Sequence, residues 1–311
     1  MARGLDENIV TDLVSVGVNN LLQYIKKDDT LDLEIRDNYL NIYYRGHNVL
    51  KIDWNRKNKE FITKAEEDYP INNTFLKTSI YELSNSFEAK NWDKYFPSAK
   101  QKIDNYHKRA TEREFQQLVV RENNYSSISI GADYFILDFE YETGERKSDL
   151  TKFDLIAVEW SSKGWARGLK KDYKPKLVII EVKYGDGSLN NEKAGILDHI
   201  EKFKSFKQKR GSNDFKEFKS EMLKVFKQKR KLGLIRDLKN NTHEVKRFHD
   251  DIKMIFLLIN HKPAKTVLKE EVKKIQTICG DQNIEFFTSN FMGYGLYEKN
   301  VVNIDRLLNM L

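Results

Sequence analysis

Cysteine is almost absent from this sequence, because Cys279 is the only one in 311 residues. A single cysteine excludes an internal disulfide framework and any zinc site made of cysteine ligands. Cys279 falls within an apolar helical pattern, so we expect it to be a small residue of the hydrophobic core.

Long apolar runs are missing as well. The first residues, Met1–Glu7, contain no apolar stretch of the kind found in secretory signal peptides. No run approaches the ~20 apolar residues that a membrane-spanning helix needs. These absences predict a soluble, cytoplasmic protein with no membrane partner.

What the sequence does contain is charge together with a sizeable apolar fraction. Hydrophobic residues make up 40% of the chain, charged residues make up 32%, and the net charge is +7. The apolar share supports a real core, and the length permits one large domain or two modest ones. The basic balance indicates a polyanionic partner, although it says nothing about the fold.

The N-terminal part predicts a small α+β unit. Apolar residues at helical spacing indicate a helix over residues 9–25. Three strands with turn-forming residues between them then predict an antiparallel meander: Leu31–Arg36, Tyr39–Arg45 and Val49–Trp54. Residues 55–110 indicate short helices interrupted by Pro70 and Pro97. We place a domain boundary near residue 100 and leave the role of residues 1–100 open.

The most informative stretch is the apolar strand Lys176–Tyr184, which nevertheless carries Glu181 and Lys183. Side chains two apart on a strand project from the same face, so this carboxylate and this ammonium lie together. A second apolar strand, Phe153–Trp160, carries Asp154 at its start. If the two strands are neighbours, Asp154 can lie beside Glu181.

The charges of this cluster suggest its chemistry. Two buried carboxylates repel each other unless a cation compensates them. Mg²⁺ would do so, because it prefers oxygen ligands and is commonly held by one or two carboxylates, several waters and a substrate phosphate. A bound metal can acidify a water and stabilise charge on a phosphodiester. The adjacent lysine would orient the attacking water or hold a phosphate oxygen.

An acid on one strand followed by acid-x-lysine on the next resembles the PD-(D/E)XK nuclease superfamily. Here Asp154 supplies the first acid and residues 181–183 supply the second motif, while the proline that often precedes the first acid is missing. The resemblance covers residues 110–290. It implies an α/β fold with a restriction-endonuclease-like αβββαβ core, whose mixed sheet is flanked by helices, within a domain over residues 101–311.

The resemblance also implies an active site. It contains two carboxylates that hold Mg²⁺ or Mn²⁺, a further acid, a lysine that acts on the water or the phosphate, and a backbone carbonyl as an additional metal ligand. Asp154 and Glu181 would be the carboxylates that hold the metal, and Glu112 would be the further acid. Lys183 would be the lysine, and the carbonyl would be that of Val182.

The further acid comes from a helix predicted over residues 111–122. Glu112 and Glu114 compete for this role. Glu114 fits a capping box that begins with Thr111, which gives it a structural function. We therefore favour Glu112, with Gln116 beside it on the same helix face.

Two other assignments stay open. Asp149 competes with Asp154 as the first acid, and we favour Asp154 because it adjoins the apolar run. His199, on a helix predicted over residues 191–206, is a candidate for contacting phosphate or supporting the site. Asp138 and Glu140 alternate with apolar residues, so we expect them to face solvent, although either could supplement the metal site.

The remaining pattern alternates strands and helices and predicts a mixed sheet. The other expected elements are a strand over residues 134–141, a strand over 252–260, a helix over 264–279, a strand over 284–288 and a helix over 304–311.

Residues 201–247 form the most basic section, with sixteen Lys and Arg residues against six Asp and Glu residues. The string Phe-Lys-Gln-Lys-Arg occurs twice there, at 206–210 and 226–230. Beside a metal–phosphate site, such a helical insertion favours a role in gripping nucleic acid. The residues expected to contact phosphates are Lys207, Lys209, Arg210, Lys227, Lys229 and Arg230.

We therefore expect a Mg²⁺-dependent nuclease, acting as a DNA endonuclease, and a homo-oligomer is compatible with the sequence. Two other interpretations remain. One is a catalytically inactive nucleic-acid-binding module of the same fold, which the intact acids and lysine disfavour. The other is an effector nuclease that is gated by a ligand bound to residues 1–100.

Overall fold

The computed structural model forms two compact units. The N-terminal unit comprises Ala2–Arg121 with Lys224–Arg236, and the C-terminal unit comprises Glu122–Leu223 with Asp237–Leu311. The residues that the structure describes are 3–14, 19–55, 57, 60–64, 92–106, 111–126, 129–143, 151–163, 173–189, 195–208, 212–236, 244–260, 267–278, 284–289 and 301–310.

This division differs from the boundary expected near residue 100. Most of α5 (Thr111–Asn124) and the second half of α7 (Asn213–Lys231) belong to the N-terminal unit. Hydrogen bonds within that unit explain the difference. In α7, the amide of Gln228 accepts from the backbone N–H of Leu5 at 2.9 Å and donates to its carbonyl at 2.7 Å.

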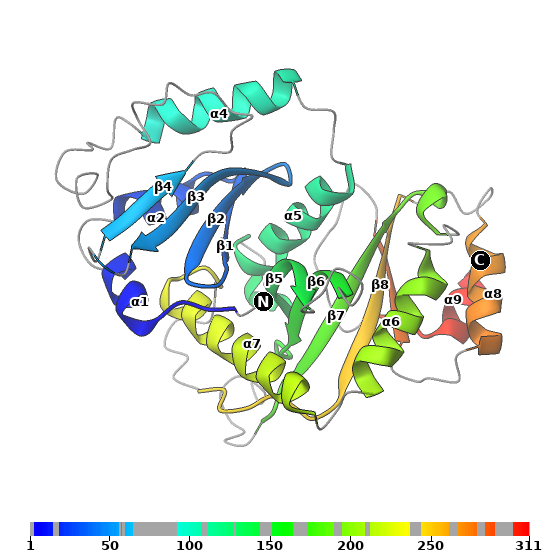
Figure 1. The fold of residues 1–311 in the computed structure, drawn as a ribbon. Coiled ribbons are helices and arrows are strands. Elements are labelled where there is room, and N and C mark those ends of the chain that lie inside the picture. Colours follow the sequence, from blue (N-terminus) through cyan, green and yellow to red (C-terminus); the bar gives the residue numbers. More distant parts are fainter. Residues whose placement is uncertain are drawn as a thin grey trace. The chain divides into compact units, whose positions relative to one another are not determined.

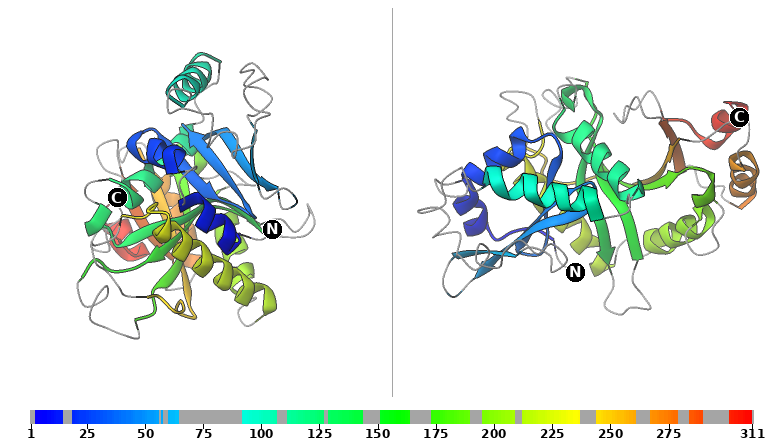
Figure 2. Two further views of the ribbon diagram at one scale, coloured as in Figure 1. Left: turned by 90° about the vertical axis from the view of Figure 1, so that its left-hand side faces the viewer. Right: turned by 90° about the horizontal axis from the view of Figure 1, so that it is seen from above.

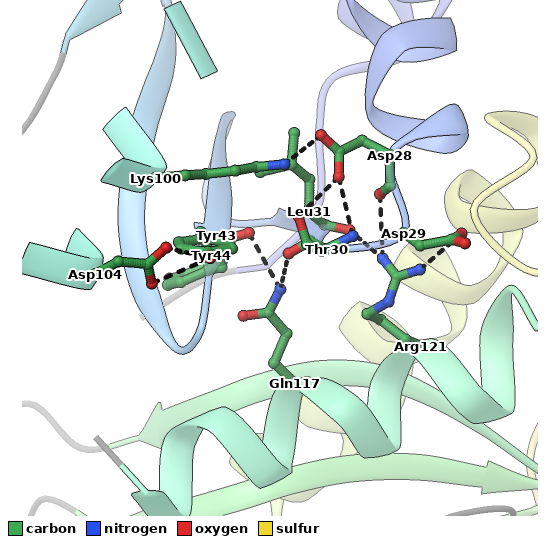
Figure 3. A network of polar contacts seen from close by, with 10 residues as sticks. All are labelled: Asp28, Asp29, Thr30, Leu31, Tyr43, Tyr44, Lys100, Asp104, Gln117 and Arg121. Carbon is green, nitrogen blue, oxygen red and sulfur yellow. Dashed lines mark hydrogen bonds and ion pairs between the residues drawn. The ribbon is translucent and has the colours of Figure 1, made fainter. Parts of the chain in front are cut away.

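Two side chains on α5 fix it within the N-terminal unit (Figure 3). Gln117 accepts from the backbone N–H of Gly46 at 2.8 Å and donates to the carbonyl of Thr30 at 3.0 Å. Arg121 donates to the carbonyl of Leu31 at 2.7 Å. Both side chains satisfy backbone groups in the turns of the N-terminal sheet or at the start of β1, so α5 packs with this sheet.

The N-terminal sheet is antiparallel, with the order β1-β2-β3-β4 (Figure 1). The three expected strands are confirmed, and a fourth that was not expected extends the meander. The strands are β1 (Leu31–Ile35), β2 (Tyr39–Tyr44), β3 (His47–Asn55) and β4 (Glu60–Lys64). Only three residues of β4 lie between charged ends, so its sequence signal is short, and pairing with β3 determines its conformation.

Helices cover the apolar face of this sheet. In place of one helix over residues 9–25, the structure has α1 (Glu7–Val14) and α2 (Asn19–Lys27). Helix α4 (Trp92–Tyr106) lies against the same sheet as α2 (Figure 2), and the rings of Tyr24 and Phe96 stack with their centroids 5.1 Å apart.

Pro97 was expected to interrupt a helix, but α4 continues through it. Pro97 is exposed, whereas Trp92, Tyr95 and Phe96 are buried and pack on one another. Aromatic packing on one side of the helix therefore outweighs the missing backbone hydrogen bond on the other side.

The C-terminal unit contains a five-stranded mixed sheet in the order β5-β6-β7-β8-β9 (Figure 1). Strands β5, β6 and β7 are antiparallel, whereas β7, β8 and β9 are parallel. The chain is thus mixed α/β, as expected. The strands are β5 (Tyr134–Thr143), β6 (Thr151–Glu159), β7 (Lys176–Tyr184), β8 (Ile252–Ile259) and β9 (Ile284–Ser289).

Helices connect and flank the parallel strands. Helix α6 (Ile196–Gln208) and α7 lie in the chain between β7 and β8, and α8 (Leu268–Ile278) lies between β8 and β9. Helix α9 (Ile304–Met310) follows and packs on α8 and β9. Within the part of the chain that the structure describes, none of the helices has the length and apolar character needed to cross a membrane.

Candidate active site

Strand β7 lies in the centre of the mixed sheet, and every one of its residues except the first and last is buried. Its neighbour β8 is buried along its whole length and places Phe256 opposite Glu181 and Leu258 opposite Lys183. The two charged side chains therefore sit among apolar neighbours, where charge is costly unless it is compensated.

The structure brings Asp154 to this position. Strands β6 and β7 pair with Leu155 opposite Ile180, so the next step of the antiparallel register brings Asp154 to Glu181. The backbone N–H of Val182 donates to Asp154 Oδ2 at 2.8 Å. This hydrogen bond holds the Asp154 carboxylate at the middle of the sheet.

The three side chains differ in their exposure. Glu181 is 0% exposed and Lys183 is 3% exposed, whereas Asp154 retains partial exposure. Asp154 is thus the least deeply buried residue of the three.

Burial raises the pKa of Asp154 well above its ordinary value, and the neighbouring Glu181 carboxylate raises it further. The hydrogen bond from Val182 and the charge of Lys183 act in the opposite direction but do not cancel these effects. Two carboxylates therefore lie close together in a largely buried place, and a bound cation would relieve their mutual repulsion.

These residues fit part of a Mg²⁺ site. Among the described residues, no three His, Cys, Asp or Glu side chains form a group that could enclose a metal ion by themselves. Mg²⁺ needs no such enclosure, because it commonly takes one or two carboxylates and completes its shell with water and substrate oxygens. The available protein donors are the carboxylates of Asp154 and Glu181 and the carbonyl of Val182.

Helix α6 adds His199 to the group. Its Nδ1 lies 3.1 Å from Glu181 Oε2. Burial and the charge of Lys183 lower the pKa of His199 to about 4, although Asp154 acts in the opposite direction. The imidazole is therefore neutral at neutral pH.

Of the two acids on β5, Asp138 differs from expectation, whereas Glu140 does not contradict it. Asp138 is fully buried, and its Oδ1 accepts from the backbone N–H of Phe139 at 2.8 Å, so it does not face solvent. Glu140 is partly exposed and has a φ of 54°. The β5–β6 register pairs the residues on either side of Glu140 with those on either side of Asp154, which brings Glu140 opposite Asp154. Simple alternation misjudged Asp138, next to which a bulge shifts the register of β5.

The helix acids belong to the N-terminal unit. Glu114 is not free for chemistry, because Arg45 Nε donates to its Oε1 at 2.9 Å. Glu112 is half-buried and Gln116 is buried. Their assignment to a site in the C-terminal unit stays a prediction, and Asp149 lies outside the described residues.

The structure removes Lys229 from the expected phosphate-binding set. Lys229 is 0% exposed, and its Nζ donates to Glu34 at 2.7 Å. The sequence contained the necessary signal, since Lys229 follows Met222, Val225 and Phe226 at the spacing of one buried helix face.

The other expected phosphate contacts vary in their surroundings. Lys227 is exposed. Lys207 is partly buried near Asp251, with Nζ and Oδ1 3.7 Å apart. Arg230 is partly exposed over the ring of Phe226. Lys209 and Arg210 lie outside the described residues.

The tyrosines and arginines of the N-terminal meander make internal contacts. Buried Arg36 donates to the hydroxyl of Tyr43 at 3.0 Å. The hydroxyl of Tyr44 donates to Asp104 at 3.0 Å, and burial together with this carboxylate raises the pKa of Tyr44 to about 12. These side chains therefore support the unit's own structure.

Comparison with models of known protein families, with curated proteins and with solved structures finds no match to this chain.

Proposed function

We propose that this protein is a metal-dependent nuclease that hydrolyses phosphodiester bonds, acting as a DNA endonuclease. One observation carries the proposal. Asp154, held by the backbone N–H of Val182, lies beside Glu181 in the centre of a mixed sheet, and Lys183 shares the strand face of Glu181.

A purely structural role explains this cluster less well. Buried ion pairs seldom stabilise a protein more than apolar residues of similar size would. Here two acids lie side by side, and the pKa of Asp154 is raised by burial and by Glu181. Such perturbed carboxylates are typical of functional sites, where the cost in stability is offset by chemistry.

The order of the elements supports the same proposal. Helix α5 precedes three antiparallel strands, and helices α6 and α7 then lead to the parallel strand β8. The superfamily resemblance implies this αβββαβ order, with the acid-x-lysine motif on the third strand, and β7 carries it here.

Each residue has a distinct part in the proposed reaction. Asp154, Glu181 and the carbonyl of Val182 would hold Mg²⁺ or Mn²⁺, which supplies charge neutralisation and a more acidic water. The Lys183 ammonium, on the same strand face as Glu181, orients the attacking water or holds a non-bridging phosphate oxygen. Most of the rate enhancement then comes from placement and charge stabilisation.

The charge of the chain favours nucleic acid over smaller phosphodiesters. Residues 201–247 contain sixteen basic and six acidic residues, so their local net charge (16 − 6 = +10) exceeds the whole-chain net charge of +7. Polyanion binding gains free energy from the release of counterions along a backbone, and a small phosphodiester offers little of this.

The test is incubation of the purified protein with plasmid, single-stranded DNA and RNA, each with Mg²⁺, Mn²⁺ or EDTA. The proposal predicts nicking or linearisation of plasmid with either metal and none with EDTA. Binding of all three substrates without cleavage under any metal would instead identify an inactive nucleic-acid-binding module. Cleavage that persists in EDTA would contradict metal dependence.

A further inference from the structure

The carboxylate pair has a close neighbour outside the sheet. His199 extends from α6, which lies beside β8 (Figure 1), and its Nδ1 is 3.1 Å from Glu181 Oε2. The imidazole is 13% exposed, and the carboxylate is 0% exposed. Two polar groups this close and this buried have to be chemically complementary.

A carboxylate offers acceptors only, so the imidazole has to present its N–H at Nδ1 to be complementary. In the conformation seen here Nδ1 and Oε2 lie within hydrogen-bonding distance, but the bond itself is not formed. Catalytic hydrogen bonds in unliganded sites are often loose in this way and tighten when the site fills.

We propose that His199 is a positioning residue, which fixes the orientation of the Glu181 carboxylate by donating Nδ1–H to Oε2. The inference rests on the proposed function, in which Glu181 holds the metal. Carboxylates that bind metals are usually held by hydrogen bonds from neighbouring groups, which set their orientation and basicity. His199 is on a separate element from the acids, so α6 contributes to the site through this side chain.

The test measures Mn²⁺ binding directly, from the loss of the electron paramagnetic resonance signal of free Mn²⁺. His199→Ala should weaken binding by about 10- to 100-fold, which is the usual effect of removing such a supporting group. His199→Asn should bind within about threefold of the wild type, because an asparagine amide N–H occupies nearly the place of Nδ1–H. Unchanged binding by His199→Ala would overturn the proposal.

His199→Gln serves as the matched control, because its amide is set further from the backbone and does not reproduce Nδ1. Asparagine should restore binding and glutamine should not, so this pair decides the question even if His199→Ala folds poorly. Equal binding by His199→Asn and His199→Gln would overturn the proposal. Lys204→Ala, on the same helix, should leave Mn²⁺ affinity within about twofold of the wild type.

Glu181→Gln separates failure of this inference from failure of the proposed function. If Glu181→Gln binds Mn²⁺ as tightly as the wild type, the metal site itself is wrong. If Glu181→Gln loses binding while His199→Ala keeps it, only the positioning role is wrong. If His199 acts through Glu181, adding His199→Ala to Glu181→Gln should cause no additional loss.

Discussion

At the scale of single residues, the main feature of this protein is the carboxylate that is kept where it is electrostatically unfavourable. Asp154 is held by one backbone N–H, partly exposed, and beside a fully buried glutamate. A protein that only needed stability would place a neutral residue there, and this difference can be measured.

Asp154→Asn should therefore stabilise the metal-free protein at neutral pH by about 0.5–2 kcal/mol. The folded-state pKa of Asp154 is raised by burial and by Glu181, so the stability contributed by the protonated acid is present below its ordinary pKa and lost as pH rises. The advantage of Asn should grow with pH. Urea unfolding in EDTA across pH 4–8 checks this, and a variant less stable than the wild type at pH 7 would contradict it.

Asp28→Asn is a control for which we expect the opposite change in the free energy of unfolding. Burial alone would raise the pKa of Asp28, but hydrogen bonds from Lys100 and Thr30 (Figure 3) lower it overall. The stability that this carboxylate contributes is present above its ordinary pKa and lost as pH falls through the lowered folded-state value. Asp28→Asn should therefore destabilise the protein at neutral pH, and the loss should shrink in acid.

Lys183→Met separates catalysis from folding. Lys183 is 3% exposed, and methionine keeps most of its buried stem while removing the charge. Cleavage should fall by about 100-fold or more, because the group that orients the water or phosphate is lost. Mn²⁺ affinity should be unchanged or higher, since a nearby positive charge has gone.

Lys176→Met is the matched control, because it makes the same substitution at the start of the same strand. It should leave the cleavage rate close to that of the wild type. Near wild-type cleavage by Lys183→Met would remove lysine from the mechanism.

At the scale of elements, one turn and one helix determine how the N-terminal unit is built. The turn between β2 and β3 uses two residues with positive φ, Arg45 at 49° and Gly46 at 76°. A Cβ on Gly46 would lie 2.8 Å from the carbonyl carbon of Arg113 on α5. Here glycine is required both for the backbone conformation and for the close approach of a helix.

Gly46→Ala should therefore lose more stability than the strained backbone conformation alone would cause. Gly185 has a similar φ of 67° but open space where a Cβ would be, so Gly185→Ala should lose about 1–2 kcal/mol from the backbone. Gly46→Ala should lose about 1–3 kcal/mol more, through the clash with Arg113. The measurement is the free energy of unfolding in denaturant. Equal losses of stability in the two variants would show that α5 can move away from the added methyl group at no cost.

The second half of α7 is tied to the N-terminal sheet by a fully buried ion pair, in which Lys229 and Glu34 are both 0% exposed. Lys229→Met should cost about 3–5 kcal/mol, because it leaves the Glu34 carboxylate in the interior without its nearest cation. Combining it with Glu34→Met should recover much of that loss. Thermal or urea unfolding of the single and double variants tests the coupling, and strictly additive losses would contradict it.

The sequence predicts the elements around the candidate site better than those around the N-terminal sheet. Continuous apolar runs placed β6 and β7 correctly, and pairing them brought Asp154 to Glu181 as expected. Burial on both sides of β7 makes its pattern unambiguous. By contrast, β4 and the continuation of α4 past Pro97 depend on contacts with distant parts of the chain, which local propensity does not contain.

Charge patterns were the least informative guide. Lys227 and Lys229 belong to the same basic string, yet one is exposed and the other is buried. A count of basic residues does not distinguish helix faces, whereas the apolar spacing that leads to Lys229 does. Asp138 was misjudged for a similar reason, since the bulge in β5 changes which side chains turn inward.

At the scale of the whole molecule, two units share a single chain that crosses between them more than once. Helix α7 contributes residues to both units, and the C-terminal unit contains the whole cluster of Asp154, Glu181 and Lys183. Removal of residues 1–100 would therefore also take away the partners of Gln228 and Lys229 in α7. Full-length protein is the proper material for every activity measurement.

Plasmid cleavage by wild-type protein and by Glu181→Gln, purified in parallel and assayed with Mg²⁺, with Mn²⁺ and with EDTA, decides whether this site hydrolyses phosphodiesters. If Glu181 holds the metal, the wild type cleaves plasmid with either metal and not in EDTA, and Glu181→Gln cleaves about 100-fold or more slowly than the wild type with either metal. A contaminating nuclease would cleave equally in both preparations. Metal-dependent cleavage of equal rate by both proteins, or no cleavage by the wild type under any condition, would contradict the claim.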